Sequence, residues 1–116
     1  NIIIMDKDNS SISQGWKFIA NDNGEYYIAN TNAANMLDVP GASTANSTSM
    51  KLWQPNGDKN QLWQVIDLNN GYFSIVNKNS NKALGVKNGD MTNGNNIDQY
   101  DYHAYDNQQW KFEVIN

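Results

Sequence analysis

The stretch NQLWQV, residues 60–65, occurs in related form at two other places in this chain. SQGWKF spans residues 13–18 and NQQWKF spans residues 107–112, so each copy has a Gln two residues before a Trp. The tryptophans follow one another at an interval of 47 residues: Trp16, Trp63 and Trp110. Motifs that recur at a fixed period of this length indicate an architecture built from repeated structural units.

The repeat extends well beyond the motif. Residues 17–63 align with residues 64–110 without a gap. Identical pairs occur along the whole alignment, among them Ile28 and Ile75, Leu37 and Leu84, Val39 and Val86, and Asn60 and Asn107. Chance similarity would not keep this register through every turn. We therefore expect a single domain over residues 1–116, divided into the tail of a first repeat (1–16), a second repeat (17–63) and a third repeat (64–116).

Within each repeat, short strand-like runs are separated by turn residues. EYYIAN and YFSIVN are rich in β-formers, and each lies next to an Asn-Gly pair, at 23–24 and 70–71, that favours a hairpin turn. MLDV and ALGV form the next short runs, and MKLWQ and IDQYDY alternate with a period of two. No window has the apolar spacing of a helix longer than about one turn. Four short strands per repeat predict an all-β, closed architecture.

Composition excludes several classes of function. The chain has 116 residues, enough for one domain, and its net charge is −4 with no arginine. We therefore expect no nucleic acid partner and no anionic membrane partner, since both need basic patches. The absence of cysteine excludes disulfides and thiolate metal sites. No apolar run approaches the twenty residues of a membrane span, so we expect no membrane insertion. We also expect no cofactor.

The three motifs in register, with Leu-Asp-Val upstream and Leu-Trp between, resemble those of the ricin-type β-trefoil lectins. The bacterial carbohydrate-binding modules of that superfamily are the most similar group, and the resemblance covers essentially the whole chain. It implies an all-β fold, a ricin B-like β-trefoil. The chain departs from the family because its first repeat is N-terminally incomplete. We therefore expect an open edge that an upstream segment, a second chain or a symmetry-related copy would fill.

The resemblance also implies a function. It predicts a non-catalytic, lectin-like module that recognises galactose-type or related glycans, as an oligosaccharide or a polysaccharide. Such a module would target an attached enzyme or toxin domain to a polysaccharide or a cell-surface glycan. A secreted or extracellular, bacterial protein fits this role. The alternative is a trefoil used for protein–protein contact without a working sugar site, since one fold serves many functions.

The repeated tryptophans and the site residues receive different interpretations. Trp16, Trp63 and Trp110 are expected to point into a threefold core and not to bind ligand. The family instead places an Asp in the Leu-Asp-Val strand, an aromatic residue 14–15 positions later and an Asn-Gln pair before the core Trp. In the middle repeat these carbohydrate-binding positions are occupied by Asp38, Trp53, Asn60 and Gln61.

Each of these four residues has an implied role. Asp38 would accept hydrogen bonds from two adjacent ring hydroxyls, and Trp53 would stack on the C–H face of the sugar. Asn60 would donate to one of the same hydroxyls, and Gln61 would hold Asp38 in place. The alternatives are a solvated turn carboxylate for Asp38 and a core position for Trp53.

The other two repeats match the pattern less well. In the third repeat Gly85 takes the place of the Asp, and a possible weaker second site consists of Tyr100, Asn107 and Gln108. A carboxylate from a neighbouring position could replace the lost one, although spacing does not show which: Asp90, Asp98 or Asp101. In the first repeat Asp6 holds the aromatic position and Ser13 the Asn position, so we expect no site there.

Other motifs are weaker. DKDNSS at 6–11 lacks the Gly and the Glu that a calcium-binding loop needs, and a polar turn is favoured. His103 is the single histidine and shows no catalytic triad on its own. The two glutamates, Glu25 and Glu113, lie at strand positions, and nothing marks them as a catalytic pair. We therefore expect neither a metal site nor an enzyme.

Overall fold

The computed structural model describes residues 2–6, 11–30, 35–86 and 97–114. These ranges contain β-strands and short 3-10 turns, as the repeat pattern predicted. The strands are β1 (Ile2–Asp6), β2 (Ser11–Ala20), β3 (Tyr26–Asn30), β4 (Met36–Asp38), β5 (Thr48–Ser49), β6 (Lys51–Trp53), β7 (Trp63–Asp67), β8 (Phe73–Asn77), β9 (Ala83–Val86), β10 (Ile97–Tyr100) and β11 (Trp110–Val114). The 3-10 turns are η1 (Pro40–Ala42), η2 (Lys59–Gln61) and η4 (Asp106–Gln108).

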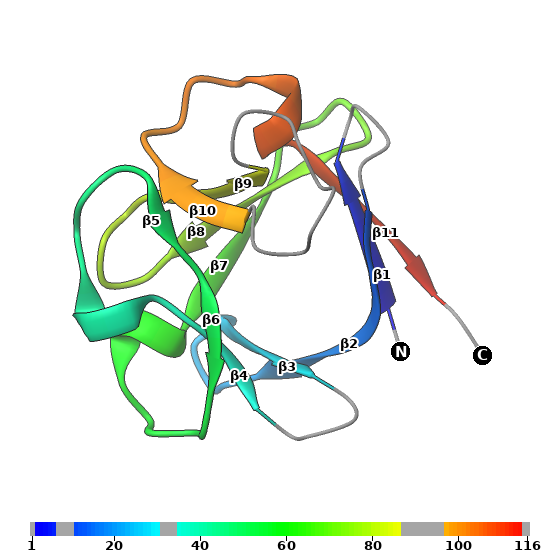
Figure 1. Ribbon diagram of the computed structural model, residues 1–116. Coiled ribbons are helices and arrows are strands. Elements are labelled where there is room, and N and C mark those ends of the chain that lie inside the picture. Colours follow the sequence, from blue (N-terminus) through cyan, green and yellow to red (C-terminus); the bar gives the residue numbers. More distant parts are fainter. Residues whose placement is uncertain (1, 7–10, 31–34, 87–96, 115–116) are drawn as a thin grey trace.

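Six antiparallel strands form a closed barrel (Figure 1). Their order around the wall is β1, β2, β3, β7, β8 and β11, and β11 pairs with β1 to close the ring. Within the second and third repeats, β2 pairs with β3 and β7 with β8 over five residue pairs each. Fewer residue pairs join one hairpin to the next: β3 pairs with β7 through Tyr26 and Trp63 alone. The all-β trefoil expected from the sequence is confirmed.

The Asn-Gly pairs lie where these barrel hairpins turn. Gly24 has a φ of 75° and Gly71 a φ of 87°, which a residue with a side chain rarely adopts. The backbone NH of Asn21 closes the first turn onto the carbonyl of Glu25 at 2.8 Å. Leu68 and Tyr72 make the equivalent bond at 3.0 Å, 47 residues later. The two repeats therefore share their turn geometry as well as their sequence.

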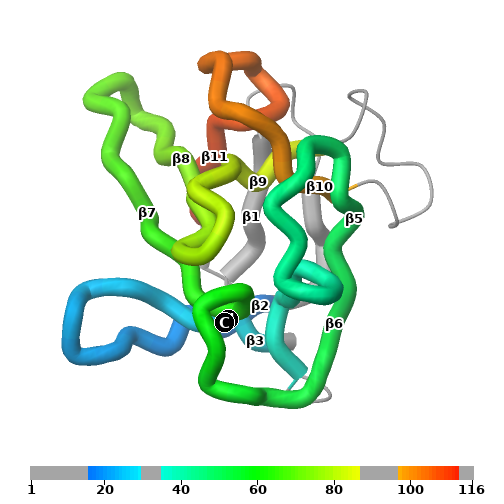
Figure 2. The backbone as a smooth tube through the Cα atoms, turned by 90° about the vertical axis from the view of Figure 1, so that its left-hand side faces the viewer, coloured from blue at the N-terminus to red at the C-terminus, as the bar shows by residue number. Residues whose placement is uncertain are grey.

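A second layer of shorter hairpins covers one end of this barrel. β4 pairs with β6 in the second repeat, and β9 pairs with β10 in the third. The loop between β4 and β6 also carries β5, which lies beside β10 and pairs with it (Figure 2). Each cap hairpin is joined to a 3-10 turn, η2 or η4, that leads into the next barrel strand.

The core repeats with the sequence. Its buried residues fall largely into pairs 47 positions apart: Ile28 and Ile75, Leu37 and Leu84, Val39 and Val86, and Trp63 and Trp110. Trp16 joins them as the third tryptophan, and it is buried too. The interpretation of the three tryptophans as core residues is confirmed. Each contributes a large apolar surface to a small core, so repetition of the motif follows from repetition of the fold.

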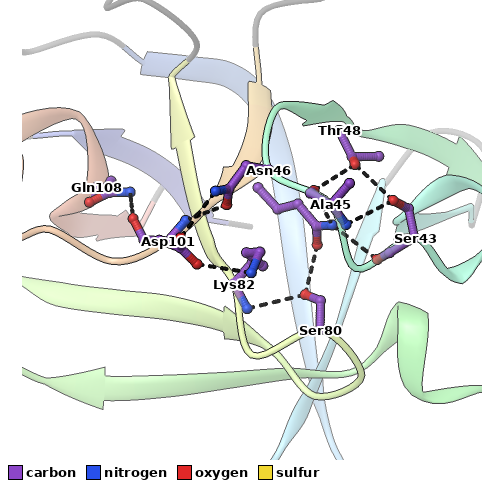
Figure 3. Close-up of polar contacts among 9 residues, drawn as sticks. Ser43, Ala45, Asn46, Thr48, Ser80, Lys82, Asp101 and Gln108 are labelled. Carbon is purple, nitrogen blue, oxygen red and sulfur yellow. Dashed lines mark hydrogen bonds and ion pairs between the residues drawn. The ribbon is translucent and has the colours of Figure 1, made fainter.

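The cap layer of the third repeat is attached to that of the second by a polar network (Figure 3). The buried side chain of Gln99 donates to the carbonyls of Ser43 and Ala45, both at 3.0 Å. Asn46 and Asp101 bond reciprocally, since the Asn46 amide donates to the carboxylate at 3.0 Å and the Asp101 backbone NH donates to Asn46 Oδ1 at 2.8 Å. Together with β5, this network buries most of β10.

The described strands close the barrel wall, and both ends of the sheet path, β5 and β6, lie in the cap layer. The barrel wall closes because β1 pairs with both β11 and β2. In the cap, β6 is the last strand of the sheet path within the described residues. All three residues of β6 are exposed, whereas three of the four in β10 are buried. The difference follows from β5, which pairs with β10, whereas within the described ranges no strand lies on the outer side of β6.

Candidate functional site

The residues predicted for the middle site come from three neighbouring elements. Asp38 is the last residue of β4, and Asn60 and Gln61 form most of η2. The backbone NH of Val39 donates to the carbonyl of Asn60 at 3.2 Å, which joins the end of β4 to η2. The strand and the turn are 22 residues apart in sequence, and the cap fold brings them into contact.

Gln61 and Asp38 form the centre of this arrangement. Gln61 Nε2 donates to Asp38 Oδ2 at 2.8 Å and to the carbonyl of Gln54 at 2.9 Å. Gln61 Oε1 accepts from the backbone NH of Asn56 at 3.0 Å, so the amide is anchored at both ends. Gln61 is fully buried and Asp38 is 2% exposed. Gln61 therefore orients Asp38 as the sequence analysis expected, and Asp38 is not a solvated turn carboxylate.

The two oxygens of Asp38 differ in their surroundings. Oδ2 accepts from Gln61 and also from Asn60 Nδ2, at 3.3 Å. Oδ1 is buried and has no hydrogen-bond partner in the described residues. A buried carboxylate oxygen without a donor is costly, so this atom has an unmet capacity to accept hydrogen bonds. Among the described polar side chains, only the indole nitrogen of Trp16 shares this condition.

Asn60 is used differently from the expectation. Its side-chain nitrogen donates to the carbonyl of Val39 at 3.1 Å as well as to Asp38. An amide nitrogen has two hydrogens, and both have partners here. Asn60 therefore holds Asp38 together with Gln61, and its nitrogen does not point a free donor at a ligand in this structure.

Trp53 lies beside this cluster on the exposed strand β6. Its side chain is 49% exposed, so it is not a core residue. In the ladder between β4 and β6, Met36 faces Trp53 and Asp38 faces Lys51. Residues opposite each other, and residues two apart on one strand, share a face of the sheet. Asp38, Lys51 and Trp53 therefore share one face, with an acceptor and an aromatic ring side by side.

Lys51 is the residue at this site that the sequence analysis did not single out. Its ammonium lies 4.1 Å from the centroid of the Trp53 ring, a cation–π contact. The period-two alternation of MKLWQ was a usable signal, because it places Lys51 on the same face as Trp53.

The third repeat keeps the amide network but not the carboxylate. Gln108 Nε2 donates to the carbonyl of Asp101 at 2.9 Å, and Gln108 Oε1 accepts from the backbone NH of His103 at 2.9 Å. Asn107 donates to the carbonyl of Val86 at 2.7 Å, as Asn60 does to Val39. A Cβ added at Gly85 would lie 3.2 Å from the carbonyl oxygen of Asn107. The turn η4 has thus packed closely against the position where the middle repeat has Asp38.

The candidate replacement carboxylates lie in different places. Asp98 is buried directly opposite Gly85 in the β9–β10 ladder, and it has interactions of its own. Asp101 pairs with Lys82 at 2.9 Å, and Asp90 lies outside the described residues. Tyr100 is 37% exposed at the end of β10, and its ring neighbours His103, which in turn neighbours Tyr105.

A groove of about 730 Å³ lies elsewhere, between the β2–β3 turn and β7. Its wall includes Glu25, which pairs with Lys78 at 2.8 Å. Hydrogen bonds from Lys78 and then Asn21 hold the pKa of Glu25 below its ordinary value. These contacts fasten the turn to the next repeat, and that structural role accounts for the buried acid. The volume of the groove does not make it the better site, since no aromatic residue lines it.

The remaining motifs give no further site in the part of the chain that the structure describes. No group of three or more metal-ligating side chains occurs there, and most of the 6–11 stretch lies outside it. Within the same ranges, no helix has the length and apolarity required to cross a bilayer. The side chain of Glu113 is likewise outside the described residues, and His103 lies exposed in a loop.

The six-stranded barrel, its hairpin caps and the Gln–Asp network define the chain as a β-trefoil of the lectin type. Residues 12–100 match the family model of the ricin-type beta-trefoil lectin domain-like proteins. The chain belongs to this family, as the resemblance in the sequence predicted. It is therefore of the carbohydrate-binding class, and a glycan is the partner that its family implies. A comparison with curated proteins finds no match.

Solved structures agree with this assignment. A designed threefold symmetric protein, ThreeFoil, is 33% identical with a TM-score of 0.82, and the match covers 93% of this chain and 74% of that one. The exo-β-1,3-galactanase 1,3Gal43A from Clostridium thermocellum is 22% identical with a TM-score of 0.87, covering 98% of this chain and 30% of that one. A mosquitocidal holotoxin is 17% identical with a TM-score of 0.82, and the match covers 99% of this chain and 17% of that one. The last two likenesses show the fold alone.

Proposed function

We propose that the chain is a non-catalytic carbohydrate-binding module that recognises galactose-type or related glycans through its middle repeat. Asp38 and Trp53 make the direct contacts, and Asn60 and Gln61 hold the carboxylate in place. The observation that carries the proposal is the buried Oδ1 of Asp38, which has no donor among the described residues, on the sheet face that also carries the exposed ring of Trp53. A sugar offers hydroxyl donors to the carboxylate oxygen and an apolar C–H face to the tryptophan ring.

Binding at this one site is expected to be weak. A shallow site that contacts one or two sugar rings buries few atoms, and affinity then depends on additional sites or on tethering. Tyr100, Asn107 and Gln108 form the proposed weaker second site in the third repeat. Its weakness follows from Gly85, which supplies no carboxylate to accept sugar hydroxyls.

We place the module in a secreted or extracellular bacterial protein, where it targets an attached enzyme or toxin domain to polysaccharide or cell-surface glycan. Support comes from the galactanase and the holotoxin, because this chain matches 30% and 17% of their lengths respectively. In those proteins the trefoil is one part of a longer chain. The sugar preference, the attachment and the localisation are all parts of the proposal.

A glycan array followed by titration of the best ligand tests the site. Asp38→Asn should reduce affinity about tenfold or more, because the charged acceptor is lost. Trp53→Ala should reduce it similarly, whereas Trp53→Phe retains a stacking ring and should lose less. Circular dichroism checks that each variant is folded. Glycan binding that survives both Asp38→Asn and Trp53→Ala would contradict the site.

The array and a second assay separate the rival functions. A trefoil used for protein–protein contact would give no glycan signal on the array with the unmodified chain. An enzyme would release product from soluble polysaccharide incubated with the chain, and we expect no product.

A further inference from the structure

Lys51 is an exposed cation within the proposed site, and no acidic residue pairs with it in the described part of the chain. It lies directly opposite Asp38 in the β4–β6 ladder and two residues before Trp53. Its ammonium is held 4.1 Å from the centroid of the Trp53 ring. The cation therefore lies on the face that presents the acceptor and the aromatic platform.

Two other lysines of the described residues are paired with acids, and Lys51 is not. Lys78 forms an ion pair with Glu25 at 2.8 Å, and Lys82 forms one with Asp101 at 2.9 Å. Opposite charges that face each other across two strands commonly interact in the same way. Lys51 instead contacts the ring of Trp53, while Asp38 Oδ1 has no partner in the part of the chain that the structure describes. The site thus retains one cationic donor and one anionic acceptor that do not bond to each other.

The fold itself does not require a lysine at this position. The equivalent residue of the third repeat, 47 positions later, is Asp98, which lies opposite Gly85. The same ladder therefore forms with either charge. Asp98 is buried beneath β5, whereas Lys51 is on the uncovered strand β6 and is open to solvent. The repeat therefore does not dictate a lysine at this position, and its side chain is open to solvent on the face of the proposed site.

We propose that Lys51 determines specificity at the middle site by donating a charge-assisted hydrogen bond to an acidic group of the bound glycan. This inference rests on the proposed function. Asp38 accepts hydroxyl hydrogens from the ligand, and by itself it would repel a nearby carboxylate or sulfate. The ammonium of Lys51 offsets that repulsion and adds a charged donor. The ligand class is thus a glycan that carries a carboxylate or sulfate close to the hydroxyls bound by Asp38.

Matched neutral and acidic sugars test the proposal by NMR titration of the full chain. The pairs are galactose and galacturonic acid, glucose and glucuronic acid, and N-acetylglucosamine and its 6-sulfate, with the Trp53 indole signal as the readout. For at least one pair, the acidic member should bind about two- to fivefold more tightly, as an exposed ion pair allows. Added salt should reduce that preference, because it screens exposed charges.

Three variants assign the preference to Lys51. Lys51→Gln should bring the ratio of acidic to neutral affinity close to one, and Lys51→Arg should keep it. Lys17→Gln removes the same charge from an exposed position on β2 and should leave the ratio unchanged. A wild-type ratio of one, or a preference that persists in Lys51→Gln, would overturn the role of Lys51 and leave the proposed function standing. If no sugar of any pair shifts the Trp53 signal, both proposals are wrong.

Discussion

The three repeated tryptophans occupy equivalent core positions but do not have equivalent hydrogen bonds. Trp63 Nε1 donates to the carbonyl of Leu37 at 3.3 Å, and Trp110 Nε1 donates to that of Leu84 at 2.9 Å. Both bonds span 26 residues. The Trp16 indole nitrogen, in contrast, is buried without a partner in the described residues. At the scale of single residues, the same side chain therefore contributes different amounts to stability.

Replacing each tryptophan by phenylalanine should reveal this difference. Trp63→Phe and Trp110→Phe each remove a buried hydrogen bond to a backbone carbonyl, whereas Trp16→Phe removes a donor that has no partner in the described residues. We expect the first two variants to lose about 1 kcal/mol or more of unfolding free energy beyond the loss in Trp16→Phe. Urea denaturation followed by circular dichroism measures this, with the exposed Trp53→Phe as a control near zero. Equal losses at all three core positions would contradict the assignment.

At the scale of elements, the contact between a cap strand and its 3-10 turn decides whether a repeat has room for a carboxylate. In the second repeat β4 and η2 enclose the side chain of Asp38. In the third repeat η4 lies so close to β9 that a Cβ on Gly85 would be 3.3 Å from Gln108 Cγ. An acid restored at position 85 would therefore require η4 to shift, so restoring the acid alone does not restore the pocket.

Gly85→Asp should accordingly destabilise the protein without creating a second strong site. Crowding against backbone in a packed region typically costs about 1–3 kcal/mol. Gly85→Ala is the matched control, since it introduces the same Cβ without the carboxylate and should lose part of that stability. Thermal unfolding measures both variants, and titration calorimetry with the array ligand counts the sites. A Gly85→Asp variant as stable as wild type, with one additional strong site, would show that the pocket remains open.

At the scale of the whole molecule, two ion pairs fasten segments that lie far apart in sequence. Lys78 with Glu25 connects the end of β8 to the β2–β3 turn, and Lys82 with Asp101 forms part of the network between the cap layers. The hydrogen bond from Lys82, followed by that from Asn46, lowers the pKa of Asp101. The pKa of Glu25 is lowered by Lys78 and Asn21. Both carboxylates therefore release protons more readily in the folded protein.

These lowered pKa values predict how stability depends on pH. The unfolded chain takes up protons first, at about pH 4, so the stabilisation is complete above that pH and is lost as the pH falls through the folded pKa values. We expect the unfolding free energy to fall as the pH drops below about 4 and through the lowered pKa values of the folded protein. The double variant Glu25→Gln with Asp101→Asn should show a shallower fall, and Asp22→Asn in an exposed turn is the charge control. Urea midpoints at a series of pH values provide the measurement, and an unchanged slope in the double variant would count against these pairs.

Much of the fold could be predicted from the repeat. The pairs Ile28 and Ile75, or Leu37 and Leu84, are recognisable in the sequence and lie at equivalent core positions. The Asn-Gly turns were equally visible, because a positive φ favours glycine. The pairing of β1 with β11 was not predictable in the same way. Strand partners that lie at opposite ends of a chain depend on closure of the whole barrel, and no local pattern encodes that.

The sequence likewise determined one part of the candidate site and the tertiary structure the other. The sequence by itself determined which residues are present: a carboxylate, an aromatic ring and an amide pair in the second repeat, and a glycine in place of the acid in the third. Only the tertiary structure decided that both amides of η2 bond to Asp38, that one oxygen of Asp38 has no partner among the described residues, and that Lys51 lies over Trp53. The physical reason is that residue types repeat with the chain, whereas exposure and hydrogen-bond partners depend on neighbouring segments. β6 and β10 occupy equivalent positions in their repeats, yet β5 pairs with β10 and not with β6.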